Sequence, residues 1–258
     1  MNTTPKTRSI FLEDIRYFEC EGLVDNGTYH HYTEKLYAVP KLAWVRANRL
    51  ATFCYQAKVS ITKRSLYICF TPALPDGAVY PTDFRNEVWQ RYVMYGLPLN
   101  FNEYNDEDKV KRVWSATLAC LQAITPPDQH KMIEAAANTV EAGGEDLQFL
   151  LGSAKTKHYL AELSYTIPTW PNMAYLLLTL TDRTSLVKST CVLFESKLYD
   201  ECSFLGGKIK IVDDNIIVST KASSDGQYYA QKNNVSSFVV AINSLIKGEA
   251  VITTNPYQ

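Results

Sequence analysis

Histidine is a frequent general base and metal ligand in proteins, and the 258-residue chain holds only four. The one adjacent pair is His30-His31. Neighbouring residues on a strand point to opposite faces, so these two imidazoles do not easily reach one metal ion. Neither His130 nor His158 has a second histidine or a cysteine four residues further along the chain. We therefore expect neither a metal centre nor a bound cofactor.

Nucleophilic catalysis requires a serine or cysteine beside a base, and the chain contains no GxSxG and no HExxH motif. Cys20 lies between Glu19 and Glu21, whose negative charges disfavour a thiolate. The acidic pairs Asp200-Glu201 and Asp213-Asp214 are typical of solvated turns. An enzyme with dispersed acid and base residues stays an alternative, although no motif supports it.

The six cysteines include no CxxC pair, and a chain of this size needs no disulfide framework. In a hairpin that turns at 62–64, Cys54 and Cys69 would be about four residues out of register, too far apart for a disulfide. We expect free thiols, most of them buried. The polar first eight residues lack the apolar core of a secretory signal, and no apolar run approaches the ~20 residues that span a bilayer. These observations predict a cytoplasmic protein without a membrane segment.

The 26 basic and 27 acidic residues nearly cancel, so no global field attracts nucleic acid. Locally, residues 35–75 contain seven basic residues and no acid, interleaved with aromatic residues such as Tyr37 and Trp44. Basic strands that carry aromatic side chains are typical of single-stranded nucleic-acid binding. A nucleic-acid or anionic-ligand site on strands within 35–64 is therefore one hypothesis. The simpler interpretation is that the basic residues are solvated while the aromatic residues pack.

Tyrosine is abundant, with 17 residues in the chain. Tyrosine and tryptophan bury a large area at low rotamer cost and keep a polar tip, which protein interfaces favour. Together with the missing catalytic motifs, this predicts a non-catalytic module that binds another protein, as an immunity-type inhibitor, adaptor or assembly subunit does. The partner could also be a second copy of the chain, in a homo-oligomer. The residues expected to contact the partner are Tyr29, His31, Tyr32, Trp44, Arg46, Arg49, Tyr228 and Tyr229.

In the first half, β-branched and aromatic residues alternate with turn residues, which favours strands. Asn105 and the three acids after it are typical of a helix N-terminus. The expected strands are 15–21, 29–39, 49–61 and 65–71, interpreted as antiparallel neighbours, and the expected helices are 83–95, 105–125 and 129–142.

The second half begins with an expected helical turn at 145–151. If Asp213-Asp214 is the two-residue loop of a hairpin, Ile209 lies opposite Val218. The other expected elements are strands at 159–167, 173–181 and 186–195, the hairpin at 208–220 and a final helix at 233–246.

The two halves also align with each other at an offset of 125 residues, where 110–121 matches 235–246 in apolar phase. We predict an α+β fold of two sheet-plus-helix units with mainly antiparallel strands, and we keep a diverged tandem duplication as a hypothesis. The predicted domains are 1–126 and 127–258.

Overall fold

The computed structural model describes residues 10–23, 31–83 and 87–257 of the chain. These residues form six α-helices, three short 3₁₀ segments and thirteen strands in three sheets, which is the predicted α+β class. The chain divides into two compact units, Met1–Gly144 and Glu145–Gln258. The helix at 130–143 belongs to the first unit, whereas the sequence-based boundary after residue 126 assigns it to the second. Among the described residues, no helix has the length and apolar character that a membrane crossing requires.

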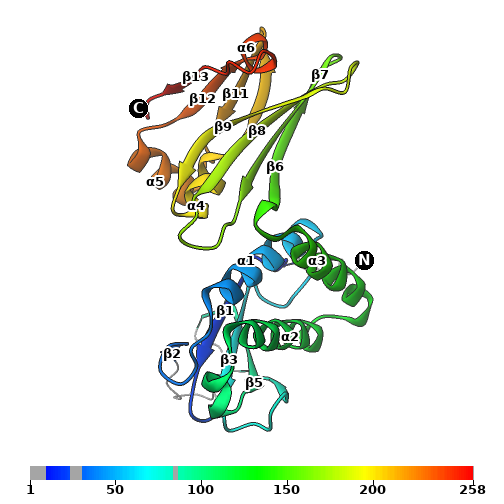
Figure 1. Ribbon diagram of the computed structural model, residues 1–258, viewed down its shortest axis with the longest axis vertical. Helices are drawn as coiled ribbons and strands as arrows, with labels where there is room; N and C mark the ends of the chain where they lie inside the picture. Colours follow the sequence, from blue (N-terminus) through cyan, green and yellow to red (C-terminus); the bar gives the residue numbers. More distant parts are fainter. Residues whose placement is uncertain (1–9, 24–30, 84–86, 258) are drawn as a thin grey trace, which may run out of the picture. The chain divides into compact units, whose positions relative to one another are not determined.

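The first unit is built on a five-stranded sheet in the order β2-β1-β3-β5-β4 (Figure 1). Its centre is parallel, because β1 pairs with β3 and β3 pairs with β5 in the same direction. Only the flanking strands β2 and β4 are antiparallel to their neighbours, so antiparallel pairing of all the early strands was wrong. The strands are β1 (Asp14–Glu19), β2 (His31–Tyr32), β3 (Ser65–Thr71), β4 (Val79–Pro81) and β5 (Gln90–Gly96).

Three helices complete this unit: α1 (Lys41–Gln56), α2 (Asp106–Ile124) and α3 (His130–Gly143). Tyr17 of β1 contacts two of them, since its ring meets Trp44 of α1 at 5.1 Å and its hydroxyl bonds to Thr117 of α2 at 2.7 Å. Phe18, the next residue, belongs to a separate buried cluster with Tyr67 and Tyr92. The sheet therefore buries apolar side chains on both of its faces. Short 3₁₀ segments lie at η1 (Leu99–Glu103), η2 (Pro127–Gln129) and η3 (Gly144–Asp146).

Helix α2 confirms the predicted helix start at Asn105. The Asn105 side chain accepts a hydrogen bond from the Asp108 backbone N–H at 2.9 Å, and three acids occupy the first turn. A side-chain cap and negative charge at the positive end of the helix dipole both stabilise a helix N-terminus.

Three predicted elements of this unit were wrong in whole or in part. Of the strand expected at 29–39, the described part is a strand only in β2, and residues 33–39 form the loop that follows it. Residues 49–56, expected as part of a strand, continue helix α1, because Ala43, Ala47, Leu50 and Cys54 recur at helical spacing and are buried. The helix expected at 83–95 is in its described part a turn followed by β5, whose QRYVMYG sequence is rich in strand-forming residues and almost wholly buried.

The second unit contains two four-stranded antiparallel sheets, in the orders β6-β7-β8-β9 and β10-β11-β12-β13. The hairpin register is confirmed, with Ile209 opposite Val218 and Ile211 opposite Ile216. The strands are β6 (Gln148–Lys155), β7 (Tyr159–Thr166), β8 (Ala174–Asp182), β9 (Lys188–Ser196), β10 (Ile209–Val212), β11 (Asn215–Ser219), β12 (Ser237–Ala241) and β13 (Ile252–Asn255).

The helices of the second unit are short: α4 (Tyr199–Leu205), α5 (Ser224–Asn233) and α6 (Ile242–Ile246). A single helix over 233–246 was wrong, because Phe238 and Val240 alternate toward the core as strand β12 before α6 begins. The helical turn expected at 145–151 is likewise limited to η3, after which β6 starts.

The structure does not confirm the tandem duplication. Residues 110–121 lie within helix α2, whereas the aligned residues 235–246 form strand β12 and the short helix α6. The sheets of the two units also differ, since the first has a parallel centre and the second is antiparallel.

Candidate functional site

The loop that follows β2 is held by one buried carboxylate. Glu19, at the end of β1, is only 1% exposed. Its two oxygens accept hydrogen bonds from the backbone N–H groups of Glu34, Lys35, Leu36 and Tyr37 at 3.2, 2.7, 3.0 and 3.0 Å. Successive N–H groups that converge in this way form an anion-binding concavity, which here holds an acid of the same chain. The carboxylate therefore determines the path of residues 34–37.

Segment η1 anchors the same loop through the side chain of Asn102. Asn102 accepts a hydrogen bond from the Ala38 N–H and donates one to the Leu36 carbonyl, both at 2.8 Å. The Tyr37 hydroxyl donates to the Leu97 carbonyl, and burial raises the pKa of this phenol. The loop is consequently fixed before any ligand arrives.

Beyond this loop lies a groove of about 810 Å³, which we call the aromatic groove. Tyr32 and Trp44 line it with ring centroids 6.2 Å apart, and Tyr32 is 52% exposed. Phe18 stacks on the Tyr32 ring at 4.6 Å, so the exposed ring rests on a buried one. The groove is lined by Tyr32, Thr33, Glu34, Ala38, Val39, Pro40, Lys41 and Trp44.

Charges of both signs surround the aromatic groove. Arg16 pairs with Asp14 at 2.5 Å and its Nη1 donates to the Tyr32 hydroxyl at 3.4 Å. Glu34 and Lys41 are exposed on the groove wall. These groups can pair with either sign of charge on a ligand, while the rings supply apolar contact.

Of the predicted partner-binding residues that the structure describes, only Tyr32 and Trp44 line this groove. Arg46 lines a neighbouring cavity of about 480 Å³ that shares Pro40 and Lys41 with it. His31 lines a third cavity beside Cys20. Tyr29 lies outside the described residues.

Arg49 is not accessible to a partner, because α1 turns it inward and leaves it 2% exposed. This corrects the expectation that 49–61 is a strand with solvated basic side chains. Tyr228 and Tyr229 lie on α5 of the second unit, where Tyr228 is 60% exposed and its ring meets that of Tyr229 at 5.1 Å.

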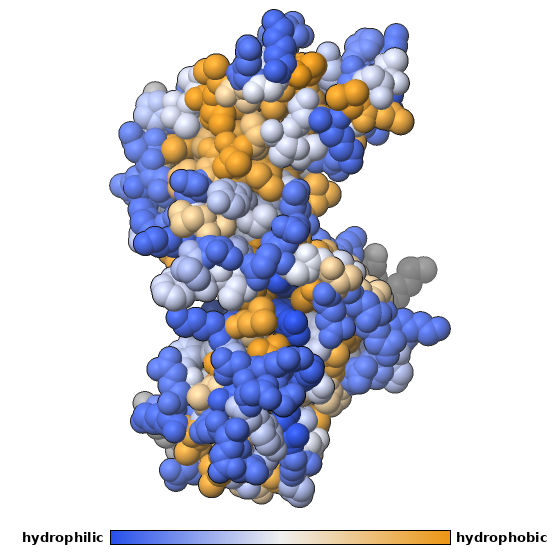
Figure 2. Space-filling model, viewed as in Figure 1, coloured by the Kyte–Doolittle hydropathy of each residue, from blue (hydrophilic) through white to orange (hydrophobic). Residues whose placement is uncertain are grey.

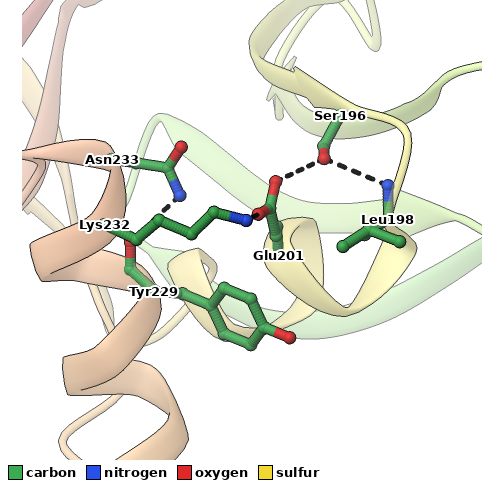
Figure 3. Close-up of polar contacts among 6 residues, drawn as sticks. All are labelled: Ser196, Leu198, Glu201, Tyr229, Lys232 and Asn233. Carbon is green, nitrogen blue, oxygen red and sulfur yellow. Dashed lines mark hydrogen bonds and ion pairs between the residues drawn. The ribbon is translucent and has the colours of Figure 1, made fainter.

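Figure 3 shows a polar cluster that joins β9, α4 and α5 in the second unit. The Ser196 hydroxyl donates to one oxygen of the Glu201 carboxylate, and the Lys232 ammonium contacts the other oxygen at 2.5 Å. Ser196 also accepts a hydrogen bond from the Leu198 N–H at 3.0 Å. Serine, lysine and carboxylate side chains also occur in hydrolytic active sites, so this cluster is the candidate for an active site built from dispersed residues.

The charges in this cluster favour a structural role. Hydrogen bonding to Glu201 raises the pKa of Lys232, so the amine stays protonated and does not act as a base toward Ser196. Burial on its own would raise the pKa of Glu201, but hydrogen bonds from Lys232 and Ser196 hold it below the usual range for glutamate. Glu201 is therefore a buried anion that ties three elements together.

This cluster predicts acid sensitivity of the second unit. Because the pKa of Glu201 is lower in the folded chain, the stabilisation is present above the ordinary glutamate pKa of 4.5 and is lost as the pH falls through the folded value. Glu201→Gln should reduce the stability of the unit at pH 7 and flatten its decline below about pH 4.5. Hydrogen–deuterium exchange of α4 across this range measures both effects. The exposed Glu195→Gln is the control, and an equal acid dependence in the Glu201 variant would contradict the prediction.

A second exposed surface lies on the outer face of the β6–β9 sheet. Leu150, Leu177 and Val192 fall in one cross-strand row, with Leu150 and Val192 50% and 44% exposed. Figure 2 shows apolar side chains gathered over β8 and β9. Exposed apolar area of this kind is common at protein contacts.

All six cysteines are thiols. Burial raises the pKa of Cys54 and Cys202 to about 12 and that of Cys191 to about 11. Cys20 differs, because its sulfur lies 3.1 Å from that of Cys69. If the early strands were antiparallel, the nearest cysteine partner of Cys69 would be Cys54. The expected antiparallel pairing therefore did not indicate the contact between Cys20 and Cys69.

Within the described parts of the chain, no three metal-ligating side chains gather into a site. No family model, curated protein or solved structure matches the chain.

Proposed function

We propose that the chain is a non-catalytic protein-binding module and that the aromatic groove of its first unit contacts the partner. The observation that carries this proposal is the exposed Tyr32 ring beside Trp44, in a groove whose wall is fixed by Glu19 and Asn102. Rigid, partly exposed tyrosine and tryptophan side chains are the residues that dominate binding energy at protein interfaces. A wall that is already ordered lowers the entropic cost of binding.

Two further observations support the proposal. Tyr32 and Trp44 rest on the buried rings of Phe18 and Tyr17, so ordering them for a partner costs little. The six free thiols suit a reducing compartment, which supports the proposal of a cytoplasmic protein. Such a surface would serve an immunity-type inhibitor, an adaptor or an assembly subunit.

Comparative capture tests the proposal. The wild-type chain, Tyr32→Ser and the control Tyr228→Ser, which removes a similarly exposed tyrosine from α5, are used as bait after chemical cross-linking. We expect a protein whose recovery depends on Tyr32 and not on Tyr228. Its purified form should bind the Tyr32 variant about 30-fold more weakly, the loss typical of one interface anchor. Equal recovery of every captured protein by both variants would contradict the proposal.

The alternative is an anionic ligand or nucleic acid bound through Lys41 and Arg46, which line adjoining cavities near the start of α1. The same capture separates this alternative, because such binding would fall with Arg46→Ala, with added salt and with nuclease treatment. Binding that depends on Tyr32 and withstands nuclease supports a protein partner.

A further inference from the structure

Two cysteines meet at the carboxyl ends of neighbouring parallel strands. Cys20 directly follows β1 and its backbone N–H donates to the Phe70 carbonyl of β3 at 3.1 Å. In the β1–β3 register Phe18 lies beside Cys69, so Cys20 and Cys69 are diagonal neighbours on one face of the sheet. Their sulfurs lie 3.1 Å apart, and the two residues are 3% and 0% exposed.

A cavity of about 400 Å³ leads to Cys20 but is not lined by Cys69. His31 and Lys35 line this cavity on the side of the loop, and Lys35 Nζ lies 3.4 Å from His31 Nε2. Glu19 and Glu21 also line it, so both signs of charge face the space. Cys20 lines the cavity, its thiol donating to the Gly22 carbonyl at 2.9 Å, and Cys69 does not, so we infer that a small uncharged oxidant meets Cys20 first.

The chemistry of the two thiols is unequal. A hydrogen bond from Cys69 lowers the pKa of Cys20, although burial and the Glu19 charge oppose this effect. The same hydrogen bond and burial raise the pKa of Cys69. Since the thiolate is the form that reacts, Cys20 is the sulfur that attacks and Cys69 is the sulfur that resolves.

We propose that Cys20 and Cys69 form a dithiol site that hydroperoxides convert reversibly into a disulfide. The Cys20 thiolate attacks one peroxide oxygen, the O–O bond breaks, and Cys20 becomes a sulfenic acid while the leaving oxygen takes up a proton to form water or an alcohol. The Cys69 thiol then attacks the Cys20 sulfur, the S–O bond breaks, and the hydroxyl leaves as water with the proton from Cys69. Two thiols have lost two electrons to the peroxide, and a reducing thiol reverses the change.

The site requires little movement to react. A disulfide has an S–S length of about 2.05 Å, so the sulfurs must approach by about 1 Å. Thr71, at the end of β3, donates to the Gly22 carbonyl at 3.1 Å and already joins the two segments. The disulfide would add a covalent link between the end of β1 and the end of β3, which backbone and side-chain hydrogen bonds already join.

Peroxide titration with mass spectrometry tests the proposal. On the wild-type chain, dilute hydrogen peroxide should remove two hydrogen atoms, about 2 Da, and link the peptides that contain Cys20 and Cys69. The link should form at least tenfold faster than oxidation of any other cysteine and should disappear on reduction. Cys20→Ser and Cys69→Ser should abolish it, and the control Cys191→Ser, which changes the most accessible thiol, should leave it intact.

A second measurement uses the unsubstituted chain, so the proposal can still be tested if a serine variant fails to fold. Phenylarsine oxide bridges two neighbouring thiols, so the reduced wild-type chain should bind one molecule at these two residues and then resist peroxide linkage. A wild-type chain that binds no arsenical at this pair, or that accumulates oxidised Cys20 without a link to Cys69, would overturn the proposal.

Discussion

Glu19→Ala is expected to lower the free energy of unfolding of the first unit by about 3 kcal/mol. The substitution removes a carboxylate that is 1% exposed and leaves the four N–H groups of residues 34–37 without their acceptor. Hydrogen bonds to a charged group contribute about 1.5–3 kcal/mol each, and water recovers part of this at the exposed end of the loop. Urea denaturation followed by tryptophan fluorescence measures the change, since three of the four tryptophans lie in this unit.

Two matched variants show whether the loss of stability comes from the hydrogen bonds that the Glu19 carboxylate accepts. Glu19→Gln should cost less, because the amide oxygen can still accept two of the four hydrogen bonds. Glu21→Ala removes an exposed glutamate two residues away and should change stability by less than about 0.5 kcal/mol. If Glu19→Ala and Glu21→Ala unfold at the same urea concentration, the carboxylate does not hold the loop.

Gly96→Ala should destabilise the first unit by about 3 kcal/mol or more. A Cβ at Gly96 would lie 1.8 Å from the Pro75 carbonyl oxygen and 2.7 Å from its carbon, and both are backbone atoms. The turn cannot move aside freely, because Gly96 accepts a hydrogen bond from the Gly77 N–H and donates one to the Ala78 carbonyl. Overpacking against fixed backbone belongs to the most damaging kinds of substitution.

Gly22→Ala is the matched control for this prediction. A Cβ added at Gly22 would have no atom of the described residues within 4 Å, so the alanine should change stability by less than about 0.5 kcal/mol. The same urea denaturation compares the two glycines. A stability loss below about 1 kcal/mol for Gly96→Ala would show that the turn at 72–78 moves aside for the added Cβ, against this prediction.

Local signals predicted several elements correctly. The β10–β11 register followed from a two-residue loop, and Asp213 and Asp214 adopt the positive φ angles of 45° and 61° that such a loop requires. Helix α2 followed from the Asn105 cap and its acids. In both cases the residues that determine the element are adjacent in the sequence.

Long-range pairing explains most of what the sequence did not reveal. Whether β1 meets β3 in parallel or antiparallel fashion depends on the crossover between them, which was misread because the aromatic residues of 49–56 resemble a strand. That one error hid helix α1 and the Cys20–Cys69 contact, and it placed Arg49 on the surface.

The aromatic groove itself was not predicted from the sequence. Tyr32 and Trp44 were selected by residue type, but no sequence pattern indicated that their rings would meet. The loop-holding role of Glu19 was missed, although a signal was present: Ile15, Tyr17 and Glu19 follow at two-residue spacing, which places the acid on the helix-covered face of β1. A carboxylate on such a face must find donors, and here the loop supplies them.

The Glu19 carboxylate must hold the wall of the aromatic groove in the free protein if that groove is a preformed binding surface. Hydrogen–deuterium exchange of the amides of Glu34, Lys35, Leu36 and Tyr37 measures this most directly, in the wild type, Glu19→Ala and Glu21→Ala. We predict slow exchange of these four amides in the wild type and Glu21→Ala, and rapid exchange in Glu19→Ala. Rapid exchange in the wild type, or unchanged protection in Glu19→Ala, would contradict a wall held by this carboxylate.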